Sequence, residues 1–162
     1  MKHYIIDAHN VIHASDVLKA HIVSSYDIAR NSLLQMIDSY SKVFPSYKFT
    51  AIFDGIIGYI SISSPKIKIM SSGEREADEL IKTKISKLKS TKNVIVVSSD
   101  LEVVGYARVN ACEVISAKAF ISLLNNPTQK KVSTSKSKSS KSEKPNTPSK
   151  KEVEEFKKLF GE

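Results

Sequence analysis

The sequence predicts an α/β fold in which a central parallel sheet lies between two layers of helices, a three-layer sandwich. Three observations predict it: short apolar runs rich in β-branched residues, helical spacing of apolar residues between those runs, and the alternation of the two patterns along the chain. Because strands separated by helices pair in parallel through right-handed crossovers, this alternation places helices on both faces of one sheet.

The apolar runs predict five strands, each followed by a polar turn. They cover residues 4–6, 49–53, 67–70, 94–97 and 114–115, of which residues 67–70 are the weakest candidate. Two helices follow from apolar residues at helical spacing. The first pattern consists of Ile28, Leu33, Leu34, Ile37 and Tyr40, and the second consists of Ala77, Ile81, Ile85 and Leu88. Residues 101–111 and 117–124 are expected to be helical as well.

The composition divides the chain of 162 residues into three parts. The folded domain is expected to span residues 1–125. Residues 126–151 consist largely of Ser, Lys, Thr and Pro and contain too few apolar residues to order themselves, which predicts a disordered basic linker. Residues 152–162 regain an amphipathic pattern, so we expect a short C-terminal helix that docks on the domain or on a partner.

The net charge of +8 favours a nucleic-acid partner, although its distribution is uneven. Residues 1–128 carry a net charge of +3 and residues 129–162 carry +5. The candidate RNA-binding residues are Lys82, Lys89, Lys92, Lys130 and Lys131. A solvated helix face would explain the lysines of the domain equally well.

Several classes of protein are excluded by what the sequence lacks. It contains no apolar stretch long enough to span a membrane and no secretory signal, so no membrane partner is expected. Cys112 is the only cysteine, which excludes an internal disulfide and a multi-cysteine zinc site and fits a reducing, cytoplasmic location. Without a glycine-rich phosphate loop, no nucleotide cofactor is expected.

Aspartates stand where the predicted strands end. Asp7, Asp54 and Asp100 follow three of these strands, and Asp78 opens the helix that begins near Ala77. In an open parallel sheet, ligands bind in the crevice at the carboxyl ends of the strands. The four carboxylates are therefore expected to meet at one edge of the sheet.

Clustered carboxylates repel one another unless a cation lies between them. Mg²⁺ or Mn²⁺ suits such a group together with the amide of Asn10, because these ions prefer oxygen ligands and Mg²⁺ takes only one or two direct carboxylates. A bound divalent ion can activate water and neutralise charge on a phosphodiester. The acids thus predict metal-dependent hydrolysis of a phosphate ester.

Each residue also has a purely structural explanation. The aspartates could cap helices or form turns, and Asn10 is a common turn residue. His9 and His13 are four residues apart but lie on either side of that expected turn, so we interpret them as loop residues, with His9 near the site. Ser98 and Ser99, directly before Asp100, are assigned to packing at a strand end, with the positioning of a water or a phosphate by their hydroxyls as the alternative. Four aspartates expected at one edge of the sheet still favour a functional site over four unrelated caps or turns.

The segments YIIDAHNVIH, AIFDG, GEREADELI, VIVVSSDLEV and ACEVISAKAF together resemble the NYN domains of the PIN-like superfamily, and within them the YacP-like bacterial ribonucleases. The resemblance covers about residues 3–124. It implies a Rossmann-like parallel sheet, a divalent-metal site at its carboxyl edge, and endonucleolytic cleavage of RNA. Some YacP-like proteins act on messenger RNA at the ribosome, which makes the ribosome a candidate partner.

Carried over to this chain, the resemblance implies a set of site residues. The catalytic set is Asp7, Asn10, Asp54, Asp78 and Asp100, and the metal ligands are Asp7, Asp78 and Asp100. His9 departs from the Gly-Tyr-Asn sequence of many relatives in the first motif.

Three other functions are compatible with the same sequence features. The main alternative is a non-catalytic PIN-like module that binds RNA or the ribosome. A metal-dependent phosphatase is a second alternative, but such enzymes usually have another aspartate two residues after the first, where this chain has His9. Cleavage of DNA is a third, because only a contact to the 2′-hydroxyl would distinguish the sugars.

Overall fold

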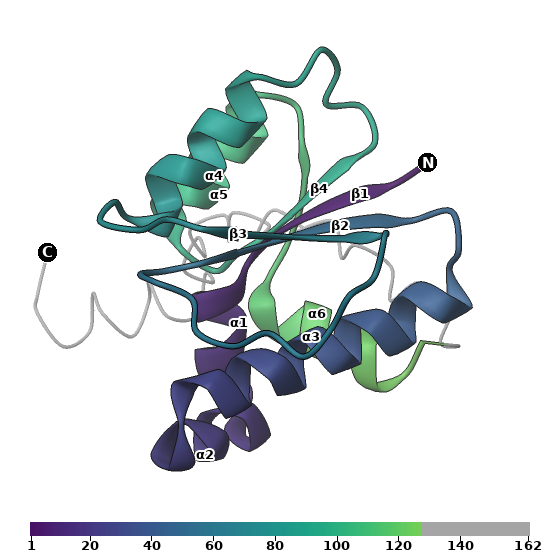
Figure 1. Ribbon diagram of the computed structural model, residues 1–162. Coiled ribbons are helices and arrows are strands. Elements are labelled where there is room, and N and C mark those ends of the chain that lie inside the picture. The colour runs from purple at the N-terminus through teal and green to yellow at the C-terminus, as the bar shows by residue number, and fades with distance from the viewer. Residues whose placement is uncertain (128–162) are drawn as a thin grey trace, which may run out of the picture. The chain divides into compact units, whose positions relative to one another are not determined.

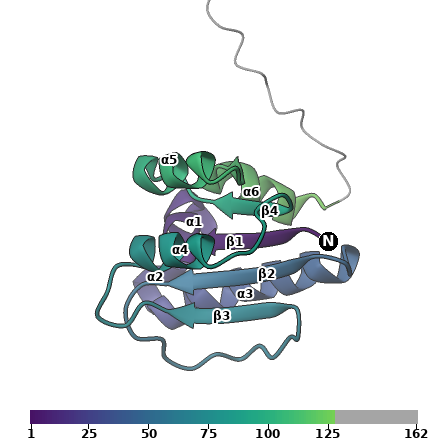
Figure 2. The same ribbon diagram turned by 90° about the horizontal axis from the view of Figure 1, so that it is seen from above.

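The computed structural model describes residues 1–127, which form a body around a five-stranded sheet (Figure 1). The strands are β1 (His3–Asp7), β2 (Lys48–Phe53), β3 (Ile67–Ser71), β4 (Val94–Val97) and β5 (Glu113–Ile115). They lie in the order β3-β2-β1-β4-β5 and every neighbouring pair is parallel (Figure 2). The predicted parallel sheet and all five predicted strands are confirmed.

Helices cover both faces of the sheet, as the alternating sequence pattern predicts. One face carries α1 (Ala8–Ala14), α2 (Asp16–Ser24), α3 (Tyr26–Val43) and α6 (Ala117–Asn125), and the other carries α4 (Ala77–Ser86) and α5 (Leu101–Val109) (Figure 1). The architecture is therefore the three-layer α/β sandwich.

The two faces of β1 contribute to two separate apolar cores. Tyr4 and Ile6 lie in the larger core, beneath α1, α3 and α6, whereas Ile5 lies in the smaller core beneath α4 and α5. Successive side chains of a strand point to opposite faces, so a strand covered on both sides is apolar throughout. In the larger core, the ring of Tyr4 packs 5.3 Å from that of Phe49 and 5.8 Å from that of Phe120, measured between centroids.

The first two helices were not predicted, and the interpretation of His9 and His13 as loop residues is wrong. Both lie on α1, which begins directly after β1. The expected turn at Asn10 is in fact a helix start, because Asp7 is the N-cap and its side chain accepts a hydrogen bond from the Asn10 backbone N–H at 3.0 Å.

The connection from β2 to β3 contains no helix. Residues 54–66 instead lie against α3, with Asn31 donating its side-chain N–H to the Tyr59 carbonyl and accepting from the Ser61 backbone N–H. Three isoleucines of this loop pack on the larger core, namely Ile57, Ile60 and Ile62. The loop thus covers part of the sheet where the other crossovers use helices.

The four predicted helical patterns are confirmed, with α3 and α6 longer than expected and α4 and α5 shorter. Ile28 is 48% exposed and does not belong to the buried stripe of α3. Leu88 lies beyond the end of α4, and α5 ends before Ala111, whose φ of 56° is left-handed. The expected C-terminal helix and nearly all of the expected linker lie outside the described residues. None of the described helices combines the length and apolar character needed to cross a membrane.

Replacing Phe120 tests the larger core. Its side chain is fully buried against Tyr4, so we expect Phe120→Ala to lower the free energy of unfolding by about 3–5 kcal/mol through lost burial and the cavity that remains. Urea denaturation followed by circular dichroism measures this loss. Val109→Ala is the control, because Val109 is 88% exposed and its truncation should change stability by less than about 0.5 kcal/mol. Equal effects of the two substitutions would contradict this packing.

Candidate functional site

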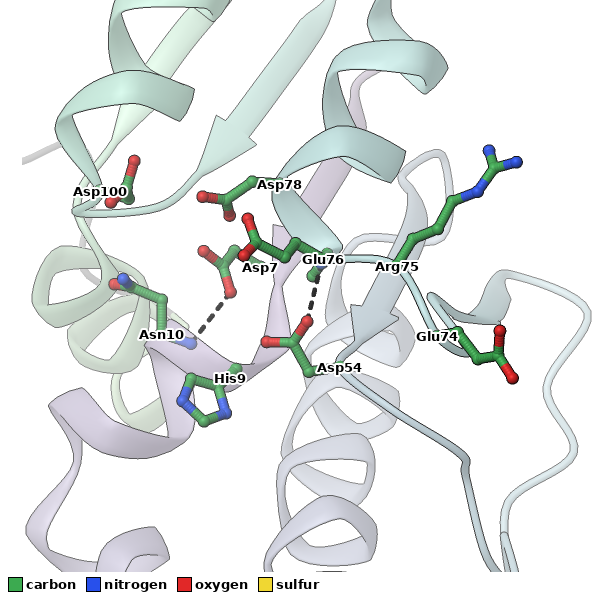
Figure 3. A pocket seen from close by; sticks show the side chains of 10 residues that line it. Asp7, His9, Asn10, Asp54, Glu74, Arg75, Glu76, Asp78 and Asp100 are labelled. Atoms are coloured by element: carbon green, nitrogen blue, oxygen red, sulfur yellow. Dashed lines mark hydrogen bonds between the residues drawn. The ribbon is translucent and has the colours of Figure 1, made fainter.

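A pocket of about 400 Å³ opens at the carboxyl edge of the sheet (Figure 3). It brings together the five site residues implied by the sequence, and six of its ten lining residues are acidic. The lining consists of Asp7, His9, Asn10, Asp54, Glu74, Arg75, Glu76, Ala77, Asp78 and Asp100.

The register of the sheet places three of these aspartates at one edge. Asp7, the last residue of β1, pairs with Ile52 of β2, and Ile6 pairs with Val97 of β4. Asp54 and Asp100 follow these partners within a few residues, where β2 and β4 have ended. Since parallel strands end at the same edge, three segments distant in sequence supply neighbouring carboxylates.

Asp7 is the most buried acid of the pocket, with 4% of its surface exposed. Its two carboxylate oxygens accept from different segments, Oδ1 from the Asn10 backbone N–H at 3.0 Å and Oδ2 from the Ser98 hydroxyl at 2.9 Å. Burial raises the pKa of Asp7 above its ordinary value, and these two hydrogen bonds oppose the rise by stabilising the charged form.

Ser98 joins two of the acids, so its assignment to packing alone is incomplete. While its hydroxyl donates to Asp7, the same oxygen accepts from the Asp100 backbone N–H at 3.1 Å. Ser98 is 1% exposed, so this link is shielded from water. The serine fixes the end of β4 relative to the carboxylate of β1.

Asp54 and Asp100 each use one carboxylate oxygen to hold a helix start. Asp54 Oδ1 accepts from the backbone N–H of Ala77, the first residue of α4, at 2.7 Å. Asp100 Oδ1 accepts from the backbone N–H groups of Glu102 and Val103 at 2.8 and 3.1 Å, as the N-cap of α5. The capping role considered for Asp100 therefore exists, whereas the contact of Asp54 with the start of α4 was not predicted. Both contacts position these carboxylates in the pocket.

The Asp78 carboxylate makes no hydrogen bond to any other described residue. Its pKa is raised to about 6, first by burial and then by the negative charges of Asp7 and Asp100, with a smaller contribution from Asp54. Lys82, one turn further along α4, opposes the rise. Asp78 is thus the acid in which the repulsion within the pocket is most evident.

The amide of Asn10 is partly occupied by the protein itself. Its Oδ1 accepts from the Ser99 backbone N–H at 3.0 Å and ties α1 to the end of β4. The Nδ2 group remains as a donor at the pocket, a chemistry suited to a phosphate oxygen or a water molecule and unsuited to a metal ion.

Five lining residues lie outside the set implied by the sequence, and one of them, Ala77, is the first residue of α4. Glu74, Arg75 and Glu76 belong to the turn between β3 and α4, and Arg75 extends away from the acids (Figure 3). No periodic pattern marks this turn, so only its position between two acidic motifs could have indicated it. His9 lies at the rim between Asn10 and Asp54 (Figure 3).

The predicted RNA-binding lysines are not gathered at the pocket. Lys82 pairs with Glu102 across α4 and α5 and acts electrostatically on Asp78 and Asp100. Lys89 and Lys92 lie in the connection before β4, at the opposite, amino-terminal edge of the sheet. Lys130 and Lys131 lie outside the described residues.

The donor chemistry of the pocket fits a hard divalent cation that keeps much of its water. Within the described residues, no three His, Cys, Asp or Glu side chains converge closely enough to hold a metal ion directly. Mg²⁺ usually takes one or two carboxylates and retains several waters, so it does not need such convergence. The Asp78 carboxylate and the Oδ2 atoms of Asp54 and Asp100 accept no hydrogen bond from other described residues. Each Asp7 oxygen accepts one hydrogen bond and keeps a second lone pair for a metal ion.

Comparison with known proteins identifies the family. The family model of the YacP-like NYN domain matches residues 4–161. The chain belongs to the YacP-like NYN domain family. Nucleases of the wider PIN-like superfamily typically use divalent metals, and membership supports a nuclease-like, RNA-related function.

Two solved structures have a similar fold, both of Rae1 (YacP) from Bacillus subtilis. One matches with a TM-score of 0.65 and 21% sequence identity, covering 77% of this chain and 74% of that chain. A point mutant of the same protein matches with a TM-score of 0.64 and 21% identity, covering 77% and 76%. A search of curated proteins found no match.

The raised pKa of Asp78 has a consequence for stability. The folded protein binds this proton more tightly than the unfolded chain does, so ionisation of Asp78 destabilises the fold as pH rises from about 4 to about 6. We expect Asp78→Asn to be more stable than the parent at pH 7 without divalent metal, by about 1 kcal/mol after solvent screening. The gain should disappear below about pH 4.

Urea denaturation in EDTA from pH 3.5 to 8 measures this difference. Glu79→Gln is the matched control, since it removes one negative charge from the same turn of α4 at an exposed position outside the pocket lining. A pH-independent gain in Asp78→Asn, or an equal pH-dependent gain in the control, would contradict the repulsion inferred here.

Proposed function

We propose that this protein is a divalent-metal-dependent endoribonuclease that uses Mg²⁺ or Mn²⁺. The supporting observation is that Asp7, Asp54, Asp78 and Asp100, from three strand ends and one helix, line the same pocket. Membership of the YacP-like NYN family supports RNA as the substrate class, and the net charge of +8 is consistent with an anionic partner.

The charge of the pocket supports the metal requirement. An RNA phosphodiester is negatively charged, and six of the ten residues that line the pocket are acidic. Without added positive charge, the substrate and the pocket would repel each other. Cations at the carboxylates would remove this conflict. They would also relieve the repulsion that, after burial, contributes to the raised pKa of Asp78.

We assign the metal ligands to Asp7, Asp78 and Asp100, with Asp54 and Asn10 as supporting members of the catalytic set. When bound, a divalent ion lowers the pKa of a coordinated water and neutralises charge that develops on the phosphate. Ser98 and the Asn10 backbone N–H keep the Asp7 carboxylate oriented. The Asn10 Nδ2 group is placed to donate to a non-bridging phosphate oxygen or to a water molecule.

Lysines outside the pocket are proposed to hold the RNA backbone without reading its sequence. Among the described lysines of this set, Lys82 is nearest the acids, and Lys89 and Lys92 would act at a distance from them. Lys130 and Lys131 are proposed to act as part of the basic tail. We further propose that residues 126–151 are a basic linker, that residues 152–162 form a short helix, and that the protein acts in the cytoplasm, with messenger RNA on the ribosome as a candidate substrate.

A non-catalytic RNA- or ribosome-binding module is the second candidate function. One observation favours it: among the described residues, no three potential ligands converge as a preformed metal site. Binding that survives loss of the acids would distinguish this candidate from a nuclease.

The decisive experiment is cleavage of labelled RNA by the full chain with Mg²⁺ or Mn²⁺, and with EDTA as the metal-free control. We expect metal-dependent internal cleavage that is abolished in Asp7→Asn, Asp78→Asn and Asp100→Asn. Ser98→Ala should retain measurable activity but lose about 10- to 100-fold, since Ser98 orients Asp7 and the start of the Asp100 segment and is not itself one of the proposed metal ligands.

Asp38→Asn is the matched control, because Asp38 lies on α3 and pairs with Lys42, outside the pocket. Cleavage that persists in EDTA, or in folded Asp7→Asn and Asp100→Asn variants, would contradict the proposed site. Absence of cleavage even with ribosomes present, together with unchanged RNA binding by all variants, would favour the binding module.

Deleting residues 126–162 tests the proposed role of the basic tail. We expect the shortened protein to bind RNA more weakly with a flatter salt dependence, because fewer counterions are released, while metal-dependent cleavage of short RNA is retained. Filter binding at several salt concentrations measures both effects. Loss of cleavage on short RNA would instead assign the tail to the active body.

A further inference from the structure

Three side chains beside the pocket form a hydrogen-bonded group, here named the aromatic patch: His9, His13 and Tyr26. The Tyr26 hydroxyl lies 3.0 Å from His9 Nδ1 and 2.9 Å from His13 Nε2. The histidines are on α1 and the tyrosine is the first residue of α3. His9 also lines the acidic pocket, so the patch is continuous with the site already described.

The patch presents aromatic surface at the rim of the pocket. The rings of His9 and Tyr26 are nearly parallel, at 11° with centroids 6.2 Å apart, and a hydrogen bond joins their edges. The hydrogen bond and the small interplanar angle hold the two rings in one relative orientation, with His9 exposed at the pocket and Tyr26 half-buried behind it. His13 lies 4.3 Å from His9 between centroids, inclined by 43°, and both histidines are exposed.

Arg30 fixes the position of Tyr26 relative to the acids. Its guanidinium carbon lies 5.1 Å from the centroid of the Tyr26 ring, a cation–π arrangement. The Arg30 side chain is 12% exposed, and its Nη1 donates to Asp27 Oδ1 at 3.1 Å. Its Nη2 donates to the backbone carbonyl of Asp54 at 3.3 Å. The same arginine therefore contacts the patch and the strand end that carries an acid of the pocket.

The hydrogen bonds of the patch determine what it can offer a ligand. A phenol has one proton, so with both imidazoles neutral Tyr26 donates to one ring nitrogen and accepts an N–H from the other. The two outward nitrogens, His9 Nε2 and His13 Nδ1, are then one donor and one acceptor. Burial is the main cause that lowers the pKa of His13, which favours its neutral form.

This combination matches a nucleobase better than a metal ion. The ring nitrogens that face Tyr26 are already used, so the histidine pair lacks the two free inward nitrogens that a helical metal pair would require. A base has an aromatic face for stacking and an edge with both donors and acceptors. A phosphate group, which offers acceptors only, would use neither the ring faces nor the outward acceptor.

We propose that the aromatic patch is a base-binding subsite, which stacks the unpaired base of a nucleotide beside the phosphodiester held at the acidic pocket. This inference rests on the proposed function for the position of that phosphodiester. Stacking on aromatic side chains requires a base that is free of its own duplex, so the subsite selects a nucleotide in a single-stranded segment.

Binding measured without cleavage tests the subsite. The full chain is titrated in Ca²⁺ against a labelled single-stranded RNA and against the same sequence as a closed hairpin stem, using fluorescence anisotropy, with RNA integrity checked on a gel. We expect Tyr26→Ala to weaken binding of the single strand by about tenfold and to leave hairpin binding unchanged. Tyr26→Phe keeps the ring and should lose less, and His13→Ala should fall between these two variants.

Tyr59→Ala is the matched control, because Tyr59 is an exposed tyrosine, at 78%, on the loop after β2. Thermal melting confirms that each variant is folded. A second readout is ultraviolet cross-linking of RNA that carries 4-thiouridine, with the expected attachment on the peptides that contain Tyr26 or His9. Parent-like single-strand binding by folded Tyr26→Ala, an equal loss in Tyr59→Ala, or an equal loss on the hairpin would overturn the proposal.

The experiments distinguish an error in the proposed base-binding subsite from an error in the proposed nuclease function. If the protein does not hydrolyse RNA, the loss of single-strand binding in Tyr26→Ala still supports a base-binding patch. If the parent cleaves RNA and Tyr26→Ala cleaves with an unchanged KM and unchanged single-strand affinity, the nuclease stands and the subsite is wrong.

Discussion

The structure around the site depends on one buried carboxylate. Asp7 ends the central strand, is 4% exposed, and accepts one hydrogen bond on each oxygen. A buried charge without partners would be strongly unfavourable, so both donors must be in place in the folded state. One donor is the backbone of Asn10, which requires α1 to start directly after β1, and the other is Ser98, which requires β4 to end beside β1. The burial of this single group thus fixes the start of one helix and the end of a neighbouring strand.

The remaining acids lie at the same edge although their carboxylates repel one another. Favourable interactions elsewhere in the fold must offset this electrostatic free energy. Two apolar cores, one on each face of the sheet, supply the favourable burial. Backbone N–H groups at helix starts stabilise the carboxylates of Asp54 and Asp100. Asp78 has no such donor among the described residues and keeps a pKa raised to about 6. Sites that bind cations commonly contain such locally unfavourable charge, because the ligand relieves it.

The sequence predicted the sheet, and the meeting of four aspartates at its edge, for a definite physical reason. Strands covered on both faces are continuously apolar, and a polar residue directly after such a run marks the edge where strands end. The prediction of local structure from the sequence failed where the same residue pattern is compatible with two conformations. Asp7 followed by Asn10 is compatible with a turn and with a capped helix, and only the burial of Val11 and Ile12 against the sheet favours α1. Tyr26 gave no signal, because it meets His9 and His13 through the packing of α3 on α1, which no local spacing encodes. The helix-free loop after β2 depends similarly on contacts with Asn31.

Because the residues after Asp7 form a helix rather than a turn, the positions of His9 and His13 are fixed relative to the acids. As a flexible turn, the segment would let His9 and His13 move independently of the acids. As a helix of about two turns, it holds both imidazoles on one side, with Asp7 at its cap. A second connection runs from Tyr26 through Arg30 to the Asp54 carbonyl. The aromatic patch is therefore held to the acidic edge from two directions, which would keep the spacing between a bound base and its phosphate constant. Constant spacing of this kind is what positioning contributes to catalysis, since a displacement of about 1 Å at the reacting atoms can cost 100-fold in rate.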